Sequence, residues 1–255
     1  MISSETLEKL AKHCQTGVFP NIIREYFQHV FLSELYKLPE SEKILFKGGT
    51  ALRIIYGSPR FSEDLDFSVF GIGQNDLKHF VEDLFIKALA EIERLGIQVA
   101  IGQKSNQTSG GYFGAATFKM LEYQPVGVEI NISSRTGRRI NGEVDSVASD
   151  FVPTYTLIHL PQDELVAEKI FGALRARKKP RDFYDLYFIM RKGMLSSSQK
   201  KQLSELKNEI LEAARKIDFC RELGAFLPVD QRNIIRDFKR ALAAELNRQI
   251  GSLVI

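Results

Sequence analysis

The segment between residues 43 and 70 constrains the fold most, because it joins two apolar stretches through a glycine turn and a helical run. KILFK at 43–47 predicts a strand, and Gly48-Gly49 ends it. Residues 50–56 predict a short helix with Thr50 as its N-cap. The alternation of acidic and apolar residues in DLDFSVF then predicts a returning strand. A strand, turn, helix and strand in one segment indicate the start of an α+β core.

The rest of the chain divides into a mixed region and a helical region. Residues 1–40 are expected to form N-terminal helices packed on the core, residues 41–150 the core, and residues 151–255 a helical C-terminal domain. The class is therefore α+β. Helices are expected at 4–36 (two), 74–95, 163–178, 181–192, 197–216 and 231–250, further strands at 97–103, 111–123 and 127–135, and a hairpin loop at 104–111.

Asp64 and Asp66 are the first candidates for chemistry. Residues two apart on a strand share a face, while Leu65 and Phe67 point to the opposite, buried face. Two carboxylates on one face repel each other unless a cation lies between them. Oxygen ligands without a nearby His or Cys favour Mg²⁺ or Mn²⁺. The alternative is a solvated strand edge, although the apolar residues after Asp66 favour a core strand.

Glu129 is the candidate for a third metal ligand. In VGVEINIS, the apolar residues face one way, and Glu129 faces the other together with Asn131 and Ser133. An acidic strand beside the first pair is the arrangement that two-metal phosphoryl transfer requires. The alternative is an acid that simply points into solvent.

The glycine turn suits a phosphate. Gly48 and Gly49 allow close backbone approach, and Thr50 can cap the helix or donate its hydroxyl to a phosphate oxygen. The P-loop pattern and the dinucleotide-binding glycine pattern are both missing here. The turn is therefore interpreted as a triphosphate-binding element, with an ordinary tight turn as the alternative.

Charge is distributed unevenly along the chain. Residues 161–255 hold 19 Lys plus Arg against 13 Asp plus Glu, a net of +6, and residues 1–160 hold 16 against 19, a net of −3. Lys169 lies at the edge of an apolar stripe, and Asp182 and Asp185 share a helix face. A basic back half suits a polyanion. The alternative is surface ion pairs with Asp182 as an N-terminal helix charge. The basic cluster comprises Arg175, Arg177, Lys178, Lys179 and Arg181.

Several classes of protein are excluded or disfavoured. No window resembles a membrane span or signal peptide, so a cytoplasmic location is expected. Cys14 and Cys220 predict neither a disulfide framework nor a zinc site. The four histidines lack ligand spacing and are interpreted as structural or surface residues. They are His13, His29, His79 and His159.

Four motifs follow one another in a recognisable order. They are KGGTALR at 47–53, RFSEDLDF at 60–67, VEIN at 128–131 and EKIFGALRARKKPRDFYDLY at 168–187. Together they resemble the AbiEii/AbiGii-type toxin nucleotidyltransferases, a branch of the DNA polymerase β-like superfamily. The resemblance implies a polymerase β-like nucleotidyltransferase sheet with flanking helices, a helical C-terminal lobe and an active site in the groove between them.

The resemblance also implies roles for individual residues. Gly48, Gly49 and Thr50 would contact the triphosphate of an NTP, with Arg60 and Ser62 also in nucleotide binding. Asp64 and Asp66 would hold Mg²⁺ or Mn²⁺, Lys169 would contact phosphates, and Asp182 or Asp185 would be the last catalytic acid. The third carboxylate of the wider superfamily is Asp in many members, whereas this chain has Glu129.

Such toxins transfer NMP from an NTP, in characterised members to tRNA 3′ ends, and are neutralised by a neighbouring antitoxin in toxin–antitoxin or phage-defence systems. Two other readings stay open. One is a nucleotidyltransferase that modifies a small molecule or a protein, and the other is a non-catalytic nucleotide-binding module.

Overall fold

The chain folds into two compact units. The computed structural model describes residues 3–13, 19–102, 106–108, 110–119, 124–135 and 140–251. The first unit comprises Met1–Gly57 and Phe61–Leu160, and the second comprises Ser58–Arg60 and Pro161–Ile255. The chain therefore enters the second unit twice, because three residues shortly before the acidic strand belong with the C-terminal part.

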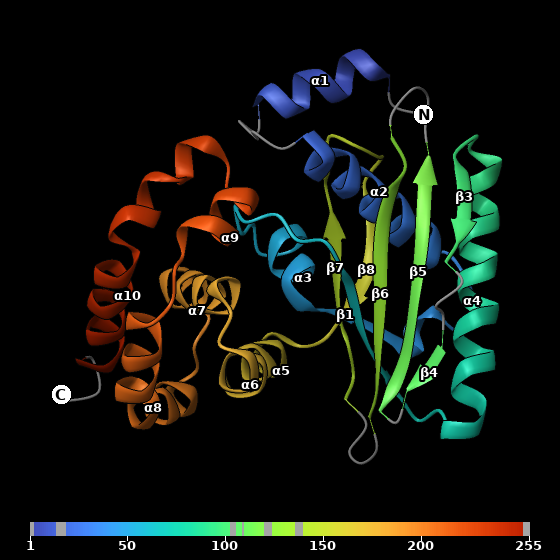
Figure 1. The fold of residues 1–255 in the computed structure, drawn as a ribbon. Coiled ribbons are helices and arrows are strands. Elements are labelled where there is room, and N and C mark those ends of the chain that lie inside the picture. The colour runs from blue at the N-terminus through green and yellow to red at the C-terminus, as the bar shows by residue number, and fades with distance from the viewer. Residues whose placement is uncertain are drawn as a thin grey trace. The chain divides into compact units, whose positions relative to one another are not determined.

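One mixed sheet organises the first unit (Figure 1). Its strands follow the order β3-β5-β6-β2-β1-β8-β7, and β4 also pairs with β5. The β1–β8 and β2–β6 pairs are parallel, and the remaining neighbours are antiparallel. The strands are β1 Ile44–Lys47, β2 Leu65–Phe70, β3 Gln98–Ile101, β4 Asn106–Thr108, β5 Gly111–Lys119, β6 Val126–Arg135, β7 Glu143–Val147 and β8 Tyr155–His159.

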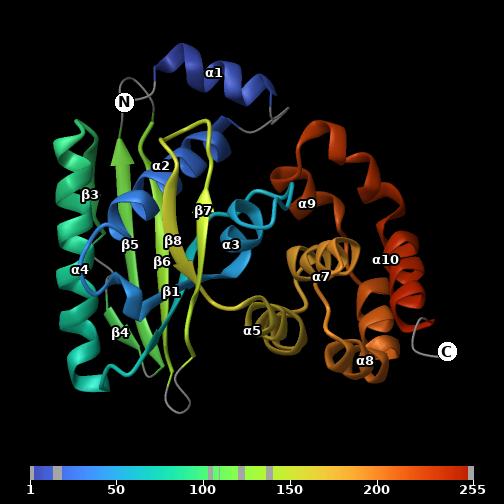
Figure 2. The same ribbon diagram turned by 180° about the vertical axis from the view of Figure 1, so that it is seen from behind.

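Helices cover the apolar face of this sheet, as Figure 2 shows for α2. Phe27 of α2 stacks on Phe118 of β5 with ring centroids 4.9 Å apart. Phe85 of α4 contacts both Phe31 of α2 and Phe67 of β2. This aromatic layer buries the face of β2 opposite to its acid. The helices of the first unit are α1 Ser4–His13, α2 Phe19–Leu35, α3 Gly48–Ile54 and α4 Gln74–Arg94.

The second unit is helical apart from the short segment Ser58–Arg60. Its core contains Phe219 and Phe238, whose ring centroids lie 4.7 Å apart, and Tyr184 stacks on Phe238. A π-helical segment, Glu168–Leu174, interrupts the first helix of this unit. The α-helices are α5 Gln162–Ala167, α6 Arg175–Arg177, α7 Pro180–Lys192, α8 Ser197–Arg215, α9 Cys220–Phe226 and α10 Asn233–Gly251.

The α+β class and most of the expected elements are confirmed, and the differences concern β4, β7, β8, α9 and the N-cap of α3. β7 and β8 have no counterpart in the sequence-based prediction, and neither has α9. β4 lies inside the expected hairpin loop 104–111, whose residues 104, 105 and 109 are outside the described residues. The end of the expected strand 111–123, residues 120–123, also lies outside them. Thr50 is not the N-cap of α3, because the helix begins at Gly48 and Lys47 occupies that position.

Candidate functional site

The acidic pair lies at the start of β2, in the middle of the sheet. Leu65 and Phe67 are fully buried on the apolar face, which confirms the predicted alternation. Asp64, immediately before the strand, and Asp66 within it are half-buried. The central position of β2, between β1 and β6, shows that these acids belong to a core strand rather than to an exposed sheet edge.

Gly48 brings the turn into contact with the acidic pair. Its φ of +88° lies in the left-handed region, which residues with a side chain rarely adopt. A Cβ atom built on Gly48 would lie 2.1 Å from Oδ2 of Asp66 and 2.7 Å from its Cβ. The carboxylate of Asp66 therefore occupies the space that any side chain at position 48 would need. The glycine turn and the second acid form one local structure.

Thr50 joins the same turn to the first acid. Its hydroxyl donates to the backbone carbonyl of Asp64 at 2.5 Å, and the residue is fully buried. The sequence predicted that this hydroxyl caps the helix or donates to a phosphate oxygen. In the structure it instead holds the backbone of Asp64. α3 and the start of β2 are thus tied together beside the acids.

The strands on either side of β2 complete a polar face. Asp66 pairs with Lys47 of β1 and with Asn131 of β6. Because paired residues point to the same side of a sheet, all three share one face. Lys47 was not among the candidates from the sequence, since its place opposite Asp66 depends on the strand register.

Glu129 lies on the same face of β6 but two residues from the partner of Asp66, and it is exposed. Among the described residues, no group of three His, Cys, Asp or Glu side chains is placed to hold one metal ion. A pair of carboxylates nevertheless fits Mg²⁺, which is usually bound through one or two carboxylates together with substrate phosphates. The donor set near Asp64 and Asp66 is therefore suited to a metal that arrives with a nucleotide.

Gln28 of α2 supports the segment that leads into the acids. Its amide donates to the backbone carbonyls of Ser62 and Glu63, both at 3.1 Å. The sequence pattern gives no sign of this contact, because the residues lie far apart along the chain. Ser62 is held here through its backbone, and its expected role in nucleotide binding stays a prediction.

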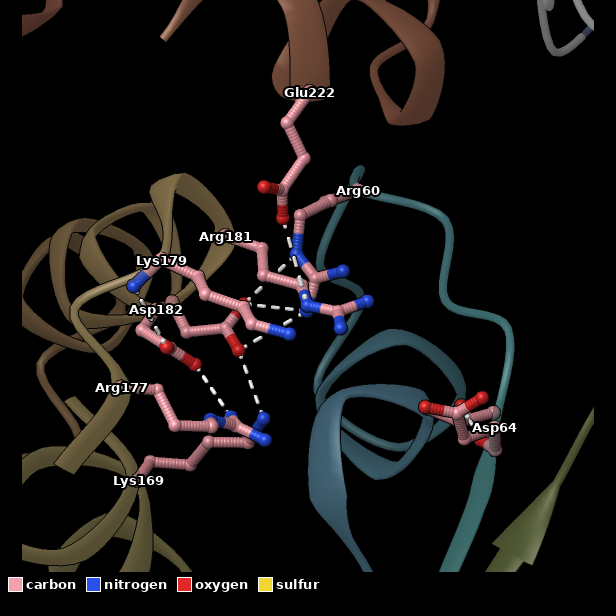
Figure 3. Close-up of polar contacts among 10 residues, drawn as sticks. Arg60, Asp64, Lys169, Arg177, Lys179, Arg181, Asp182 and Glu222 are labelled. Atoms are coloured by element: carbon pink, nitrogen blue, oxygen red, sulfur yellow. Dashed lines mark hydrogen bonds and ion pairs between the residues drawn. The ribbon is translucent and has the colours of Figure 1, made fainter. Parts of the chain in front are cut away.

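The second unit contains a buried ionic cluster around Asp185. Figure 3 labels its two basic partners, Arg60 and Lys169. Arg60 donates to both oxygens of Asp185, with Nη2 at 2.8 and 3.0 Å, and Lys169 Nζ donates to Oδ2 at 2.9 Å. The side chains of Arg60 and Asp185 are 3% and 2% exposed, and that of Lys169 is 11% exposed. Burial alone would raise the pKa of Asp185, but Arg60 and Lys169 outweigh it and lower the pKa below its ordinary value.

Asp182 has a different environment. One oxygen accepts from the backbone N–H of Lys179 at 3.1 Å, and the other accepts from Arg177 at 2.6 Å. This caps the N-terminus of α7, as the alternative reading of the sequence suggested. Asp182 and Asp185 are therefore both engaged with basic groups in the second unit.

Lys169 lies in the π-helical segment Glu168–Leu174. A π-helical turn widens a helix by one residue and often occurs at functional positions. The expected helix at 163–178 is thus present but irregular where Lys169 is located.

Much of the basic cluster is paired within the second unit. Lys178 lies 3.0 Å from Glu209, and Arg181 lies 3.5 Å from Glu222. Together with the Arg177–Asp182 pair, these contacts match the alternative reading of surface ion pairs for three of the five cations. Arg175 and Lys179 are exposed.

The histidines fit the structural or surface interpretation. His13 and His79 are exposed. His29 is buried against Tyr155, its Nδ1 lying 2.9 Å from the hydroxyl, and burial followed by the charge of Arg53 lowers the pKa of His29 to about 4. His159 is buried and contacts Asp145 through Nε2 at 3.0 Å. Cys220 is an exposed free thiol, and Cys14 lies outside the described residues.

Comparison with known proteins agrees with this architecture. Residues 30–251 match the family model described as nucleotidyl transferase AbiEii toxin, type IV toxin–antitoxin system. A structure assigned as a nucleotidyltransferase from H. pylori superposes with a TM-score of 0.63 at 17% identity, covering 99% of this chain and 97% of that chain. JHP933 from Helicobacter pylori superposes with a TM-score of 0.61 at 18% identity, covering 99% and 95%. At these identities the two structures support the fold alone.

No curated protein matches the chain. Within the part of the chain that the structure describes, no helix combines the length and apolar character needed to cross a membrane.

Proposed function

Because the chain belongs to the AbiEii family of nucleotidyltransferase toxins from type IV toxin–antitoxin systems, we propose that it transfers NMP from an NTP to the 3′ end of tRNA. In this reaction an acceptor hydroxyl attacks the α-phosphorus and loses its proton. A new oxygen–phosphorus bond forms, the bond to the β-phosphate oxygen breaks, and pyrophosphate leaves. A cognate antitoxin would counteract this activity.

The contact between Gly48 and the carboxylate of Asp66 carries the proposal. It brings the glycine turn, which suits a phosphate, close to Asp66, which suits a metal ion. Transfer from a metal-bound triphosphate requires these two elements in one place. Asp64 and Asp66 would hold Mg²⁺ or Mn²⁺, with Glu129 as a further carboxylate on the same face. When bound, the cation would stabilise charge on the attacking and leaving oxygens.

The remaining residues have supporting parts in this proposal. The backbone at Gly48 and Gly49 would approach the triphosphate, while Thr50 holds Asp64 in place through its carbonyl. In the second unit, Lys169 and Arg60 would contribute positive charge for phosphates, and Asp185 would position both of them. Asp182 would keep the start of α7 in place. The acceptor RNA would be attracted by the net positive charge of residues 161–255.

The test is a transfer assay with purified protein, Mg²⁺, each labelled NTP in turn and total tRNA. We expect label in tRNA with the wild type and its loss by more than about a hundredfold in Asp64→Asn and Asp66→Asn, the scale for removing one electrostatic group. Glu63→Gln is the matched control, because this neighbouring acid faces Arg24 at 3.5 Å and is no expected metal ligand.

Three outcomes would contradict parts of the proposal. Label on the protein or on a small molecule instead of tRNA would favour the other transferase reading. Full activity in Asp66→Asn would remove the acidic pair from the mechanism. Equal growth of cells that express wild type or Asp66→Ala, without an antitoxin, would count against toxicity by catalysis.

A further inference from the structure

Lys47 is a buried cation on the face that carries the acidic pair. It is the last residue of β1 and is only 7% exposed. The antiparallel register places it directly opposite Asp66. Directly opposed residues in such a pair have Cβ atoms about 4.5–5.5 Å apart on the same side of the sheet.

The side chain of Lys47 extends over β2. Its Nζ donates to Oγ of Ser133 at 3.3 Å, and Ser133 lies on β6. Since β2 separates β1 from β6, the lysine crosses β2 on the face of Asp66. Ser68 of β2, which pairs with Ser133, is fully buried, and its hydroxyl finds no hydrogen-bond partner among the described residues.

A lysine at this position has an energetic cost that needs a reason. Ile44, Leu45 and Phe46 of the same strand are all buried and apolar. Burying an ammonium group is unfavourable unless opposite charge and hydrogen bonds compensate. The compensating charge on this face is acidic, and a nearby cation also reduces the repulsion between two neighbouring carboxylates.

We propose that Lys47 is a positioning residue of the transfer site, whose ammonium balances the carboxylate face and sets its affinity for the divalent cation and the nucleotide. The inference rests on the proposed function. The ammonium group of Lys47 acts beside Asp66 with two opposite effects. The positive charge repels a dication and so weakens its binding, while the same charge attracts the triphosphate.

The test measures Mn²⁺ binding to the nucleotide-free protein by calorimetry, together with KM for NTP in the transfer assay. We expect Lys47→Met to bind Mn²⁺ roughly tenfold more tightly, which is the effect of one unit charge at about 6 Å from a dication in a water-like dielectric. The KM for NTP should rise in the same variant. Lys47→Arg keeps the charge and should stay within about twofold of the wild type in both measurements.

Lys43→Met is the control for removing a lysine nearby, because Lys43 pairs with Glu40 just before β1. It should leave Mn²⁺ affinity unchanged. If Lys47→Met does not fold, as judged by circular dichroism, Lys47→Gln provides the same readout with a hydrogen-bonding side chain.

A purely structural lysine would give a different pattern. Unchanged Mn²⁺ affinity in folded Lys47→Met or Lys47→Gln, or equally weakened affinity in Lys47→Met and Lys47→Arg, would overturn the inference. If the wild type is active with Mn²⁺ in these cases, the proposed function stands. A wild type that neither binds Mn²⁺ nor transfers nucleotide would overturn both.

Discussion

Gly48 and Gly57 allow the site to be probed at the scale of single residues. Both have positive φ, +88° and +76°, so a side chain at either position strains the backbone. A Cβ on Gly48 would meet the carboxylate of Asp66, whereas one on Gly57 would meet nothing within 4 Å. The two glycines therefore separate backbone strain from displacement of the acid.

We predict that Gly57→Ala costs about 1–2 kcal/mol of stability, the usual penalty for the left-handed conformation, and keeps full transfer activity. Gly48→Ala should cost more and abolish transfer, because Asp66 must move. Thermal denaturation and the transfer assay check this. Equal losses of activity in both variants would mean that strain alone, rather than the contact with Asp66, explains the need for Gly48.

Individual residues also show how much of the site could be predicted from the sequence. The alternation around Asp64 and Asp66 correctly predicted Leu65 and Phe67 as buried, because a period of two needs no knowledge of neighbouring strands. Lys47 and Gln28 could not be found in this way. Their contacts with the acidic segment depend on strand register and on helix packing, which a local pattern does not encode.

At the scale of elements, Thr50 connects α3 to the start of β2. We predict that Thr50→Val, which keeps the shape but removes the hydroxyl, costs about 1 kcal/mol or more, because the carbonyl of Asp64 loses its donor. Transfer activity should also fall, since the backbone of the first acid is released. Thr50→Ser keeps the hydroxyl and should retain most activity.

Chemical denaturation and the transfer assay measure these effects. Loss of activity in Thr50→Ser together with retained activity in Thr50→Val would show that the methyl group, rather than the hydrogen bond, matters.

Helices and strands with a clear periodicity of apolar residues were predictable from the sequence. Elements without such a periodicity were missed or only partly described. The amphipathic pattern of α4 gave its boundaries to within one residue, Gln74–Arg94 against 74–95. In β7, four of five residues are exposed, so the edge strand carries no apolar alternation to detect. The π-helical segment around Lys169 was read as ordinary helix, since a single extra residue per turn hardly changes the apolar spacing.

At the scale of the whole molecule, Asp185 holds together residues from distant parts of the sequence. Asp185 has a lowered pKa, so its ion pairs contribute stability above the unfolded-state value of 3.8, and this contribution is lost as the pH falls through the folded-state pKa. We predict that Asp185→Asn costs about 3–5 kcal/mol at pH 7, because Arg60 and Lys169 lose their partner.

The difference in stability between wild type and Asp185→Asn should shrink near pH 3, as urea denaturation at both pH values would measure. Glu209→Gln is the control, because its partner Lys178 is at the surface and its removal should change little. A difference between wild type and Asp185→Asn that is the same at both pH values would contradict the role of the charge.

The discontinuous second unit also sets an order of events during biosynthesis. Arg60 is translated 125 residues before Asp185, which corresponds to roughly 6–25 s at ordinary translation speeds. The strands β2 to β8 are all translated within that interval, since β2 begins at Leu65 and β8 ends at His159. The carboxylate of Asp185 is therefore added only after these strands have been translated. A nascent chain that stalls before residue 185 would carry the complete acidic strand but lack the carboxylate to which Arg60 is finally bound.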